Sequence, residues 1–103
     1  MSSRIRALIE KAIQSNPVTI FSKTTCGYCM QAKSTLEYEH IKYKAIELDQ
    51  MVEEGREIQE GLKSMTGQST VPNIFIRGRH LGGFSDLERA EDTGKLSQWL
   101  EVK

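Results

Sequence analysis

Both cysteines of the chain stand close together, at positions 26 and 29. Two thiols with two residues between them can cycle between a dithiol and a disulfide, so this spacing is typical of a redox site. The species that attacks a disulfide is the thiolate, and an ordinary cysteine is mainly protonated at neutral pH. A reactive cysteine therefore needs positive charge or free backbone N–H groups beside its sulfur.

The sequence around the pair predicts such surroundings for Cys26. Residues 18–22 form a continuous apolar run that is typical of a buried strand, and the segment behind Cys26, as far as residue 39, predicts a helix. The unpaired N–H groups and the positive dipole end of that helix would then lie at Cys26. Lys23 can add a full positive charge. We expect Cys26 to ionise readily and to act as the exposed nucleophile.

Cys29 lies one helical turn further on, in an inward stripe with Ala32 and Leu36. This position predicts a resolving thiol, which can attack a mixed disulfide held on Cys26. Tyr28, between the cysteines, can wall the site and offer a hydroxyl donor.

Two other interpretations of the cysteines are open. A zinc site needs four ligands, and only His40 and His80 could join the pair, neither of them at ligand spacing. Both histidines are expected to be solvated, in loops or at a sheet edge. The second interpretation, two inert buried cysteines, would make their place between a strand and a helix a coincidence.

The remaining pattern predicts a mixed sheet flanked by helices. In order, it indicates a helix containing residues 5–13, a strand over 43–48, a loop over 49–55, a helix over 56–66, a strand over 72–77, a strand beginning at 80, and helices over 86–91 and 96–100. Ser3 and Ser85 are expected to cap helices, and Gly67 to end one. Gly61 lies inside the predicted helix over 56–66, where glycine costs about 1 kcal/mol relative to alanine, and this weakens the assignment. A strand–helix–strand unit implies a right-handed parallel crossover.

Composition limits the remaining function classes. The 103 residues are enough for one domain, over residues 1–103, and lysine plus arginine equal aspartate plus glutamate at 14 each. We therefore expect neither a nucleic-acid partner nor an anionic membrane. No run approaches the roughly 18 apolar residues of a spanning helix. The first residues lack the apolar core of a secretory signal, so a cytoplasmic location is expected.

Three motifs in order carry a family resemblance: residues 23–30, 67–76 and 82–87. With them the chain resembles a dithiol glutaredoxin over nearly its whole length. The resemblance implies a thioredoxin fold, α/β, with a four-stranded mixed sheet in the order 2-1-3-4 and helices on both faces. It implies reduction of protein disulfides and of glutathione mixed disulfides, with electrons from glutathione. It also implies a cis peptide bond before Pro72.

The resemblance further implies a glutathione site. Its expected members are Lys23, Gln59, Thr70, Val71, Pro72, Gly82, Gly83, Ser85 and Asp86. Lys23 and Gln59 would hold the glycine carboxylate. The backbone of Val71 would pair with the cysteinyl part like an added strand. Ser85 and Asp86 would receive the γ-glutamyl end at a helix N-terminus.

The chain departs from the common family pattern around its cysteines. Thr25 stands where an aromatic residue is frequent, Gly27 where proline is frequent, and Met30 where a basic residue is frequent. Some glutaredoxins with a small residue directly after the first cysteine share a [2Fe-2S] cluster between two subunits. Each subunit then supplies its first cysteine and a glutathione sulfur. Cys26 would be the metal ligand in that alternative. We expect a monomer acting on glutathionylated and disulfide-containing proteins, or a dimer when a cluster is shared.

Overall fold

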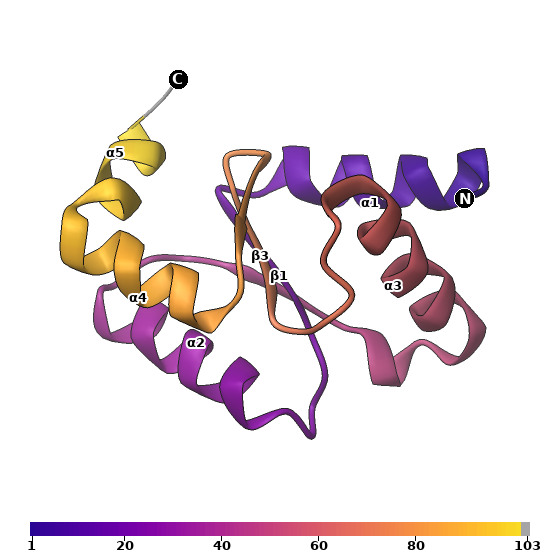
Figure 1. Cartoon of the computed structure of the whole chain (residues 1–103), viewed down its shortest axis with the longest axis horizontal. Helices are drawn as coiled ribbons and strands as arrows, with labels where there is room; N and C mark the ends of the chain where they lie inside the picture. Colours follow the sequence, from indigo (N-terminus) through magenta and orange to yellow (C-terminus); the bar gives the residue numbers. More distant parts are fainter. Residues whose placement is uncertain (102–103) are drawn as a thin grey trace.

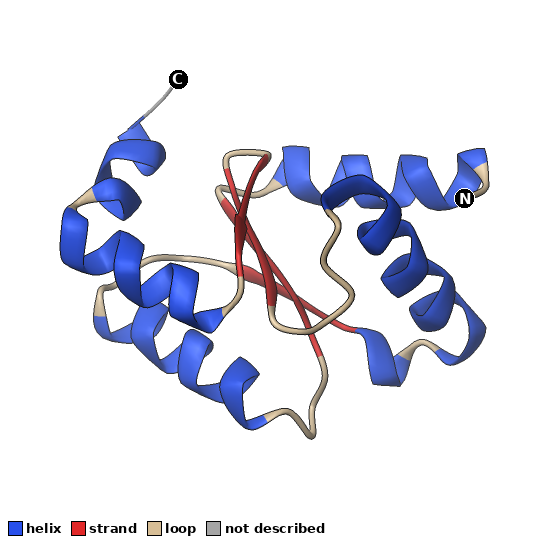
Figure 2. Cartoon of the chain, viewed as in Figure 1, coloured by secondary structure: helices blue, strands red, loops and turns tan. Residues whose placement is uncertain are grey.

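The computed structural model describes residues 1–101 and contains a four-stranded sheet in the order β2-β1-β3-β4 (Figure 2). The strands are β1 (Val18–Ser22), β2 (Lys44–Glu47), β3 (Asn73–Ile76) and β4 (Arg79–Gly82). β1 pairs in parallel with β2 and antiparallel with β3, and β3 pairs antiparallel with β4. The predicted mixed sheet and its strand order are confirmed.

Helices cover both faces of this sheet (Figure 1). One face carries α1 (Ser3–Ser15) and α3 (Val52–Thr66), and the other carries α2 (Gly27–Tyr38), α4 (Phe84–Thr93) and α5 (Lys95–Glu101). A short 3-10 helix, η1 (Leu48–Gln50), links β2 to α3. The two faces hold separate apolar clusters, so the sheet is the middle of three layers.

The continuous apolar character of β1 follows from this layering. All five of its residues are buried, because helices cover both of its faces. Val18 and Ile20 pack with α2 and α4, whereas Phe21 packs with α1 and α3. The buried Thr19 hydroxyl donates to the Ala12 carbonyl, at 3.2 Å. β1 is thus fixed in register, and the loop that contains Cys26 begins directly after its last residue, Ser22.

Both predicted serine caps were wrong by one or two positions. The residue that caps α1 is Ser2, whose hydroxyl accepts a hydrogen bond from the backbone N–H three residues on, and Ser3 is already helical. α4 begins at Phe84, so Ser85 lies inside its first turn and Gly83 is the N-cap. The Asp86 carboxylate replaces the missing cap by accepting from the Gly83 N–H at 2.8 Å.

The predicted loop over residues 49–55 was also wrong. Apart from Met51 it is helical, first as the end of η1 and then as the first turn of α3. The two acidic residues of that turn, Glu53 and Glu54, lie at the positive end of the helix dipole, which favours a start there despite the polar sequence. Gly67 ends the helix as predicted, with a left-handed φ of 81°.

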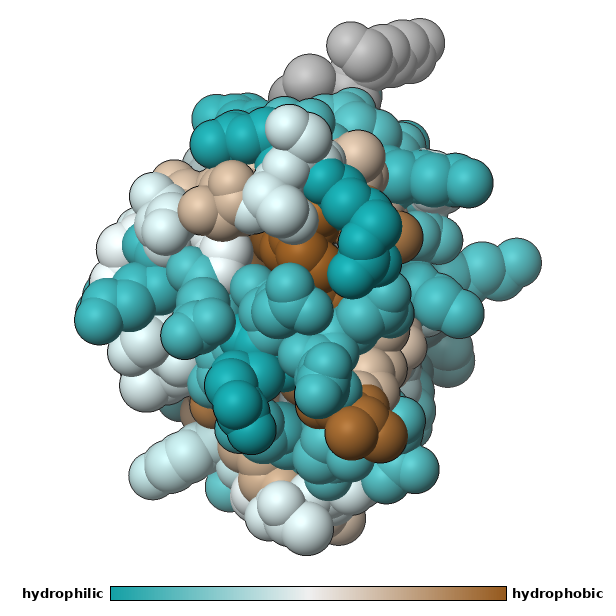
Figure 3. Space-filling view, turned by 90° about the vertical axis from the view of Figure 1, so that its right-hand side faces the viewer, coloured by the Kyte–Doolittle hydropathy of each residue, from teal (hydrophilic) through white to brown (hydrophobic). Residues whose placement is uncertain are grey.

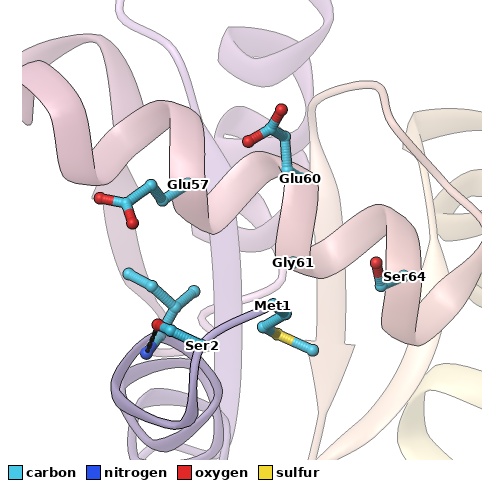
Figure 4. Close-up of a pocket in the computed structure, with 7 residues that line it drawn as sticks. Met1, Ser2, Glu57, Glu60, Gly61 and Ser64 are labelled. Atoms are coloured by element: carbon cyan, nitrogen blue, oxygen red, sulfur yellow. Dashed lines mark hydrogen bonds between the residues drawn. The ribbon is translucent and has the colours of Figure 1, made fainter.

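Gly61 is explained by the close crossing of α3 with the start of α1 (Figure 4). A Cβ at this position would lie 2.8 Å from the Met1 sulfur and 3.0 Å from the Ile9 Cδ1 atom. A small polar cavity of about 290 Å³ opens beside it, between Ser2, Glu57 and other side chains of the two helices. Packing therefore outweighs the low helix propensity of this glycine.

Hydrophilic side chains cover most of the face that Figure 3 shows, and apolar groups appear there only in small separate areas. Within residues 1–101, none of the helices combines the length and the apolar character that a membrane crossing requires.

Candidate active site

Cys26 occupies the N-cap of α2 with an extended backbone (φ −93°, ψ 117°). Its sulfur accepts a hydrogen bond from the Cys29 N–H at 3.2 Å, in the way that a serine or aspartate oxygen usually caps a helix. Its own N–H donates to the Lys23 carbonyl at 3.1 Å, which closes the turn before the helix. A free N–H group of the first turn of α2 thus donates to a half-buried sulfur, so that the sulfur lies at the N-terminus of the helix.

A segment far along the chain completes the surroundings of Cys26. The Cys26 sulfur lies 3.7 Å from the Val71 carbonyl oxygen, 45 residues away in sequence. The Val71–Pro72 peptide bond is cis, as expected. Pro72 is buried, while the Val71 side chain is half-buried and Thr70 is exposed. The reactive sulfur and the 70–72 segment therefore face each other across the entrance of the site.

Cys29 has the opposite surroundings. Its side chain is fully buried, with Ala32 and Leu36 along the inward stripe of α2. Burial, followed by a hydrogen bond with the Cys26 sulfur, raises the pKa of the Cys29 thiol. Hydrogen bonds from the Lys23 backbone and the Ser22 side chain act in the opposite direction but are outweighed. Both cysteines are free, and only Cys26 is open to an incoming reagent.

We expect a brief iodoacetamide treatment of the reduced protein at neutral pH to alkylate Cys26 and to leave Cys29 unmodified. The reason is that Cys29 is buried and its raised pKa keeps it protonated. Mass spectrometry of the cysteine peptides measures the two yields, and the same treatment in denaturant, where both should react, is the control. Equal labelling of the native protein would contradict this assignment.

A carboxylate fixes the loop before Cys26. Both oxygens of Asp49, from η1, accept from the Thr24 backbone N–H at 3.1 and 3.0 Å, and one also accepts from the Thr24 hydroxyl. These bonds hold the pKa of Asp49 below its usual value. The bond from the Thr24 hydroxyl has the largest effect, the bond from the Thr24 N–H is next, and the Lys23 ammonium lowers the pKa further. The loop position is therefore set by an element that follows β2, the neighbouring strand.

We expect Asp49→Ala to lower turnover of a mixed disulfide by about three- to tenfold, because the Cys26 loop loses its fixed position. Asp49→Asn keeps one acceptor oxygen and should lose less. Because the pKa of Asp49 is depressed on folding, its stabilising contribution is present above the ordinary pKa of about 3.9 and is lost as the pH falls below it.

Steady-state rates and acid denaturation curves of both variants and of wild type measure these effects. Thr24→Val, which removes the hydroxyl but keeps the N–H, is the matched control. Unchanged turnover in Asp49→Ala would show that the loop holds its position without this bond.

A groove of about 560 Å³ opens beside the reactive sulfur, and we call it the active-site groove. It is lined by Tyr28, Thr70, Val71, Pro72, Gly83, Phe84, Ser85 and Glu88. The Tyr28 side chain is 63% exposed, and its ring centroid lies 5.9 Å from that of Phe84. The groove thus runs from α2, past the 70–72 segment, to the N-terminus of α4.

Four of the predicted glutathione residues lie outside the lining of this groove: Lys23, Gln59, Asp86 and the buried Gly82. The Lys23 ammonium is close enough to Asp49 to lower its pKa. Gln59 donates from its amide nitrogen to the Ser69 carbonyl at 2.8 Å. Asp86 holds the groove wall in place by accepting a hydrogen bond from the Gly83 N–H. Its carboxylate would also collide with any Cβ at position 82, where φ is 129°. The other predicted members line the groove together.

Sequence reasoning missed three residues around the groove. Phe84 and Glu88 line it, and the signal for Phe84 was its place between the predicted Gly83 and Ser85. Gln68, between Gly67 and the 70–72 segment, donates to the Thr70 and Pro72 carbonyls at 3.1 and 2.9 Å. It therefore holds in place the backbone on both sides of Val71.

His80 was expected to be solvated, and this is only partly right. It lies on the edge strand β4, but it is half-buried, with its ring centroid 5.2 Å from that of Phe75. Burial lowers its pKa, and its Nε2 atom lies 3.2 Å from the Gln68 side-chain oxygen. His40 is exposed, as expected. Among the described residues, no group of three or more potential metal-binding side chains comes together.

A dithiol at a helix N-terminus, on a four-stranded mixed sheet with helices on both faces, defines a thioredoxin-fold disulfide oxidoreductase. A family model described as Glutaredoxin matches residues 18–81. Glutaredoxin-1 of Rhizophagus irregularis is 50% identical over 98 residues, which cover 95% of this chain and 96% of the relative. The chain belongs to the glutaredoxin family and is a thiol–disulfide oxidoreductase.

Solved structures agree with this assignment. The holo form of glutaredoxin C1 from Populus tremula x tremuloides has a TM-score of 0.90 at 34% identity, with 96% of this chain and 97% of that chain covered. A buckwheat glutaredoxin–glutathione complex has a TM-score of 0.87 at 36% identity, with 97% and 94% covered. Some other relatives carry mitochondrial or chloroplastic names.

Proposed function

We propose that this protein uses glutathione to reduce glutathione mixed disulfides and protein disulfides. One observation carries the proposal: the reachable sulfur of Cys26 lies against the 70–72 segment, at the entrance of a groove that ends at a helix N-terminus. The similar buckwheat glutaredoxin was solved as a complex with glutathione, which supports the same ligand for this chain.

The active-site groove has the chemistry that a tripeptide with two carboxylates and one ammonium needs. The backbone of Val71 offers an N–H and a carbonyl to the cysteinyl part, with Thr70 and Pro72 beside it. The N-terminus of α4 at Ser85 offers free N–H groups to the γ-glutamyl carboxylate. Asp86 would accept from the ammonium. Gly83 lets the ligand come close to the backbone.

Lys23 and Gln59 would bind the glycine carboxylate from outside this lining. The Lys23 side chain is half-buried in the loop that leads to Cys26, close enough to Asp49 to lower the pKa of that carboxyl group. One amide N–H of Gln59 bonds to Ser69, which leaves the other for the ligand. Both residues would add affinity for glutathione over a neutral thiol.

The proposed reaction starts with the Cys26 thiolate attacking the glutathionyl sulfur of a mixed disulfide. The Cys26–glutathione bond forms, the substrate S–S bond breaks, and the substrate leaves as a thiolate that takes a proton from solvent. A second glutathione thiolate then attacks the glutathionyl sulfur and leaves as oxidised glutathione, which regenerates Cys26. With a protein disulfide, the Cys26 thiolate would form a mixed disulfide with one protein sulfur and release the other as a thiolate that takes a proton from solvent. Cys29 would then lose its proton to solvent and attack the Cys26 sulfur, which releases the second protein thiolate and gives the Cys26–Cys29 disulfide. Two glutathione molecules would reduce this disulfide and leave as oxidised glutathione. Tyr28 would wall the reacting sulfurs.

The test is reduction of a small glutathione mixed disulfide, coupled to glutathione and glutathione reductase. A matched assay coupled to thioredoxin reductase, without glutathione, is the control. We expect turnover in the first assay and little in the second. Turnover only in the second would contradict the proposal.

The alternative function is a [2Fe-2S] carrier or redox sensor. One feature favours it: an added Cβ at Gly27 would meet no atom within 4 Å, so the space beside the residue that follows Cys26 is open. Because Cys29 is buried, one chain offers Cys26 alone, and two chains with two glutathione sulfurs would have to supply the four thiolates. Anaerobic purification with glutathione, a visible spectrum and a sizing column test this. A colourless monomer would exclude it.

We also propose that the chain acts as a single domain and a monomer in the cytoplasm. The balanced charge gives no overall field that would attract a nucleic acid or an anionic membrane, and a redox-active cysteine pair suits a compartment that keeps thiols reduced. Microscopy of the tagged full-length protein would test the location, because relatives are named for several compartments.

A further inference from the structure

The first turn of α2 turns Cys29 inward and leaves two large apolar side chains outside. Tyr28 is 63% exposed and Met30 is 60% exposed, directly before and after the buried Cys29. Met30 lies four residues after Cys26, and its N–H donates to the Cys26 carbonyl at 3.2 Å. Residues at this spacing share one side of a helix, and their side chains lean toward its N-terminus. Cys26 is the N-cap and has an extended backbone, so Met30 lies in the turn that follows it, with its side chain leaning toward that end of α2.

The two exposed side chains belong to different surfaces. Tyr28 lines the active-site groove together with Phe84, whereas Met30 and Thr25 do not line it. A glutathione lying in the groove would cover Tyr28. Met30 would stay uncovered, in the turn that follows the reactive cysteine.

The uncovered side of the site carries little charge. Thr25, Gly27 and Gln31 are exposed and uncharged. The cation nearest in sequence on α2, Lys33, is paired with Glu47 at 2.6 Å, and its side chain is only 20% exposed. The nearest other charges, Lys23 and Asp49, lie close to each other at the loop before Thr25. A charged substrate segment would therefore lose hydration here and gain little from an opposite charge.

We propose that Met30 contacts the leaving protein and selects glutathionylated cysteines that have apolar neighbours. This rests on the proposed function. The attacking, central and leaving sulfurs must lie nearly in line, so the leaving protein cannot occupy the groove that holds glutathione. It leaves over the Thr25 and Met30 side, where an apolar neighbour of its cysteine covers the thioether. Met30 is thus a specificity-determining residue.

Three glutathionylated pentapeptides test the proposal. They differ only in the residues that flank the cysteine, which are leucine in the first peptide, glutamate in the second and lysine in the third. We expect the wild-type kcat/KM to be about fivefold higher for the leucine peptide than for either charged peptide, because part of a leucine side chain would be buried against Met30. Met30→Lys should raise kcat/KM for the glutamate peptide about two- to fivefold and lower that for the lysine peptide. Met30→Leu should keep the wild-type order.

Tyr38→Lys is the matched control. It adds the same charge to the same helix, at an 81% exposed position about 12 Å further along, and should leave all three values unchanged. A small mixed disulfide without a peptide is measured in parallel, and failure there would reject the proposed function itself. With that activity intact, equal kcat/KM for the three peptides, or a shift in Tyr38→Lys as large as in Met30→Lys, would overturn the selective role of Met30.

Discussion

Cys26→Ser is expected to reduce deglutathionylation by at least about a thousandfold, because a serine hydroxyl cannot replace the thiolate that attacks the disulfide. The position makes this loss specific. Cys26 is the sulfur that caps α2 and faces the Val71 carbonyl, and it is the cysteine that a reagent can reach. Glutathione-coupled reduction of a mixed disulfide measures the rate.

Cys29→Ser is the matched control for this prediction. Deglutathionylation needs one thiol, so this variant should keep its rate within about threefold of wild type. Reduction of a protein disulfide should fall strongly, because the buried thiol that resolves the mixed disulfide is gone. Equal loss of deglutathionylation in the two variants would contradict the separate roles of the cysteines.

Gly55→Ala is expected to lower the free energy of unfolding by about 2–3 kcal/mol. Helix propensity alone predicts the opposite, a gain of about 1 kcal/mol for alanine within a helix. Gly55 is buried where α3 packs on η1, and a Cβ there would collide with the Leu48 carbonyl oxygen and lie 3.0 Å from its carbon. These are backbone atoms, so relief requires a shift of the whole element. Urea denaturation at constant m-value measures the change.

Gly61→Ala, six residues further along the same helix, is the matched control. Its Cβ would meet the Met1 sulfur and the Ile9 Cδ1 atom, which are the ends of flexible side chains. The gain in helix propensity should then offset most of the strain, so that stability changes by less than about 1 kcal/mol. A Gly55→Ala protein as stable as Gly61→Ala would show that η1 can move away from α3. The turnover of Gly55→Ala should be measured as well, because a shift of η1 would also move Asp49, which holds the Cys26 loop.

Local sequence determined the central part of this protein. The apolar run of β1, the cysteine spacing and the inward stripe of α2 depend on neighbours within a few residues, and such patterns are visible along the chain. The place of Cys26 at the helix start followed directly. The resemblance to glutaredoxins added the sheet order and the 70–72 segment, which the structure brings to the sulfur.

Tertiary structure decided what lies beside those elements. The hydrogen bonds that Thr24 donates to Asp49, the amide contacts of Gln68 and the place of Phe84 in the groove join residues that are far apart in the sequence or belong to different segments. The order of residues along the chain does not mark such pairs. The start of α3 was missed for a related reason. Its first turn is polar and contains a glycine, and the sequence does not show that this glycine packs closely on η1. The raised pKa of Cys29 was also a tertiary outcome, because burial against the sheet is its largest cause and the hydrogen bond with the Cys26 sulfur adds to it.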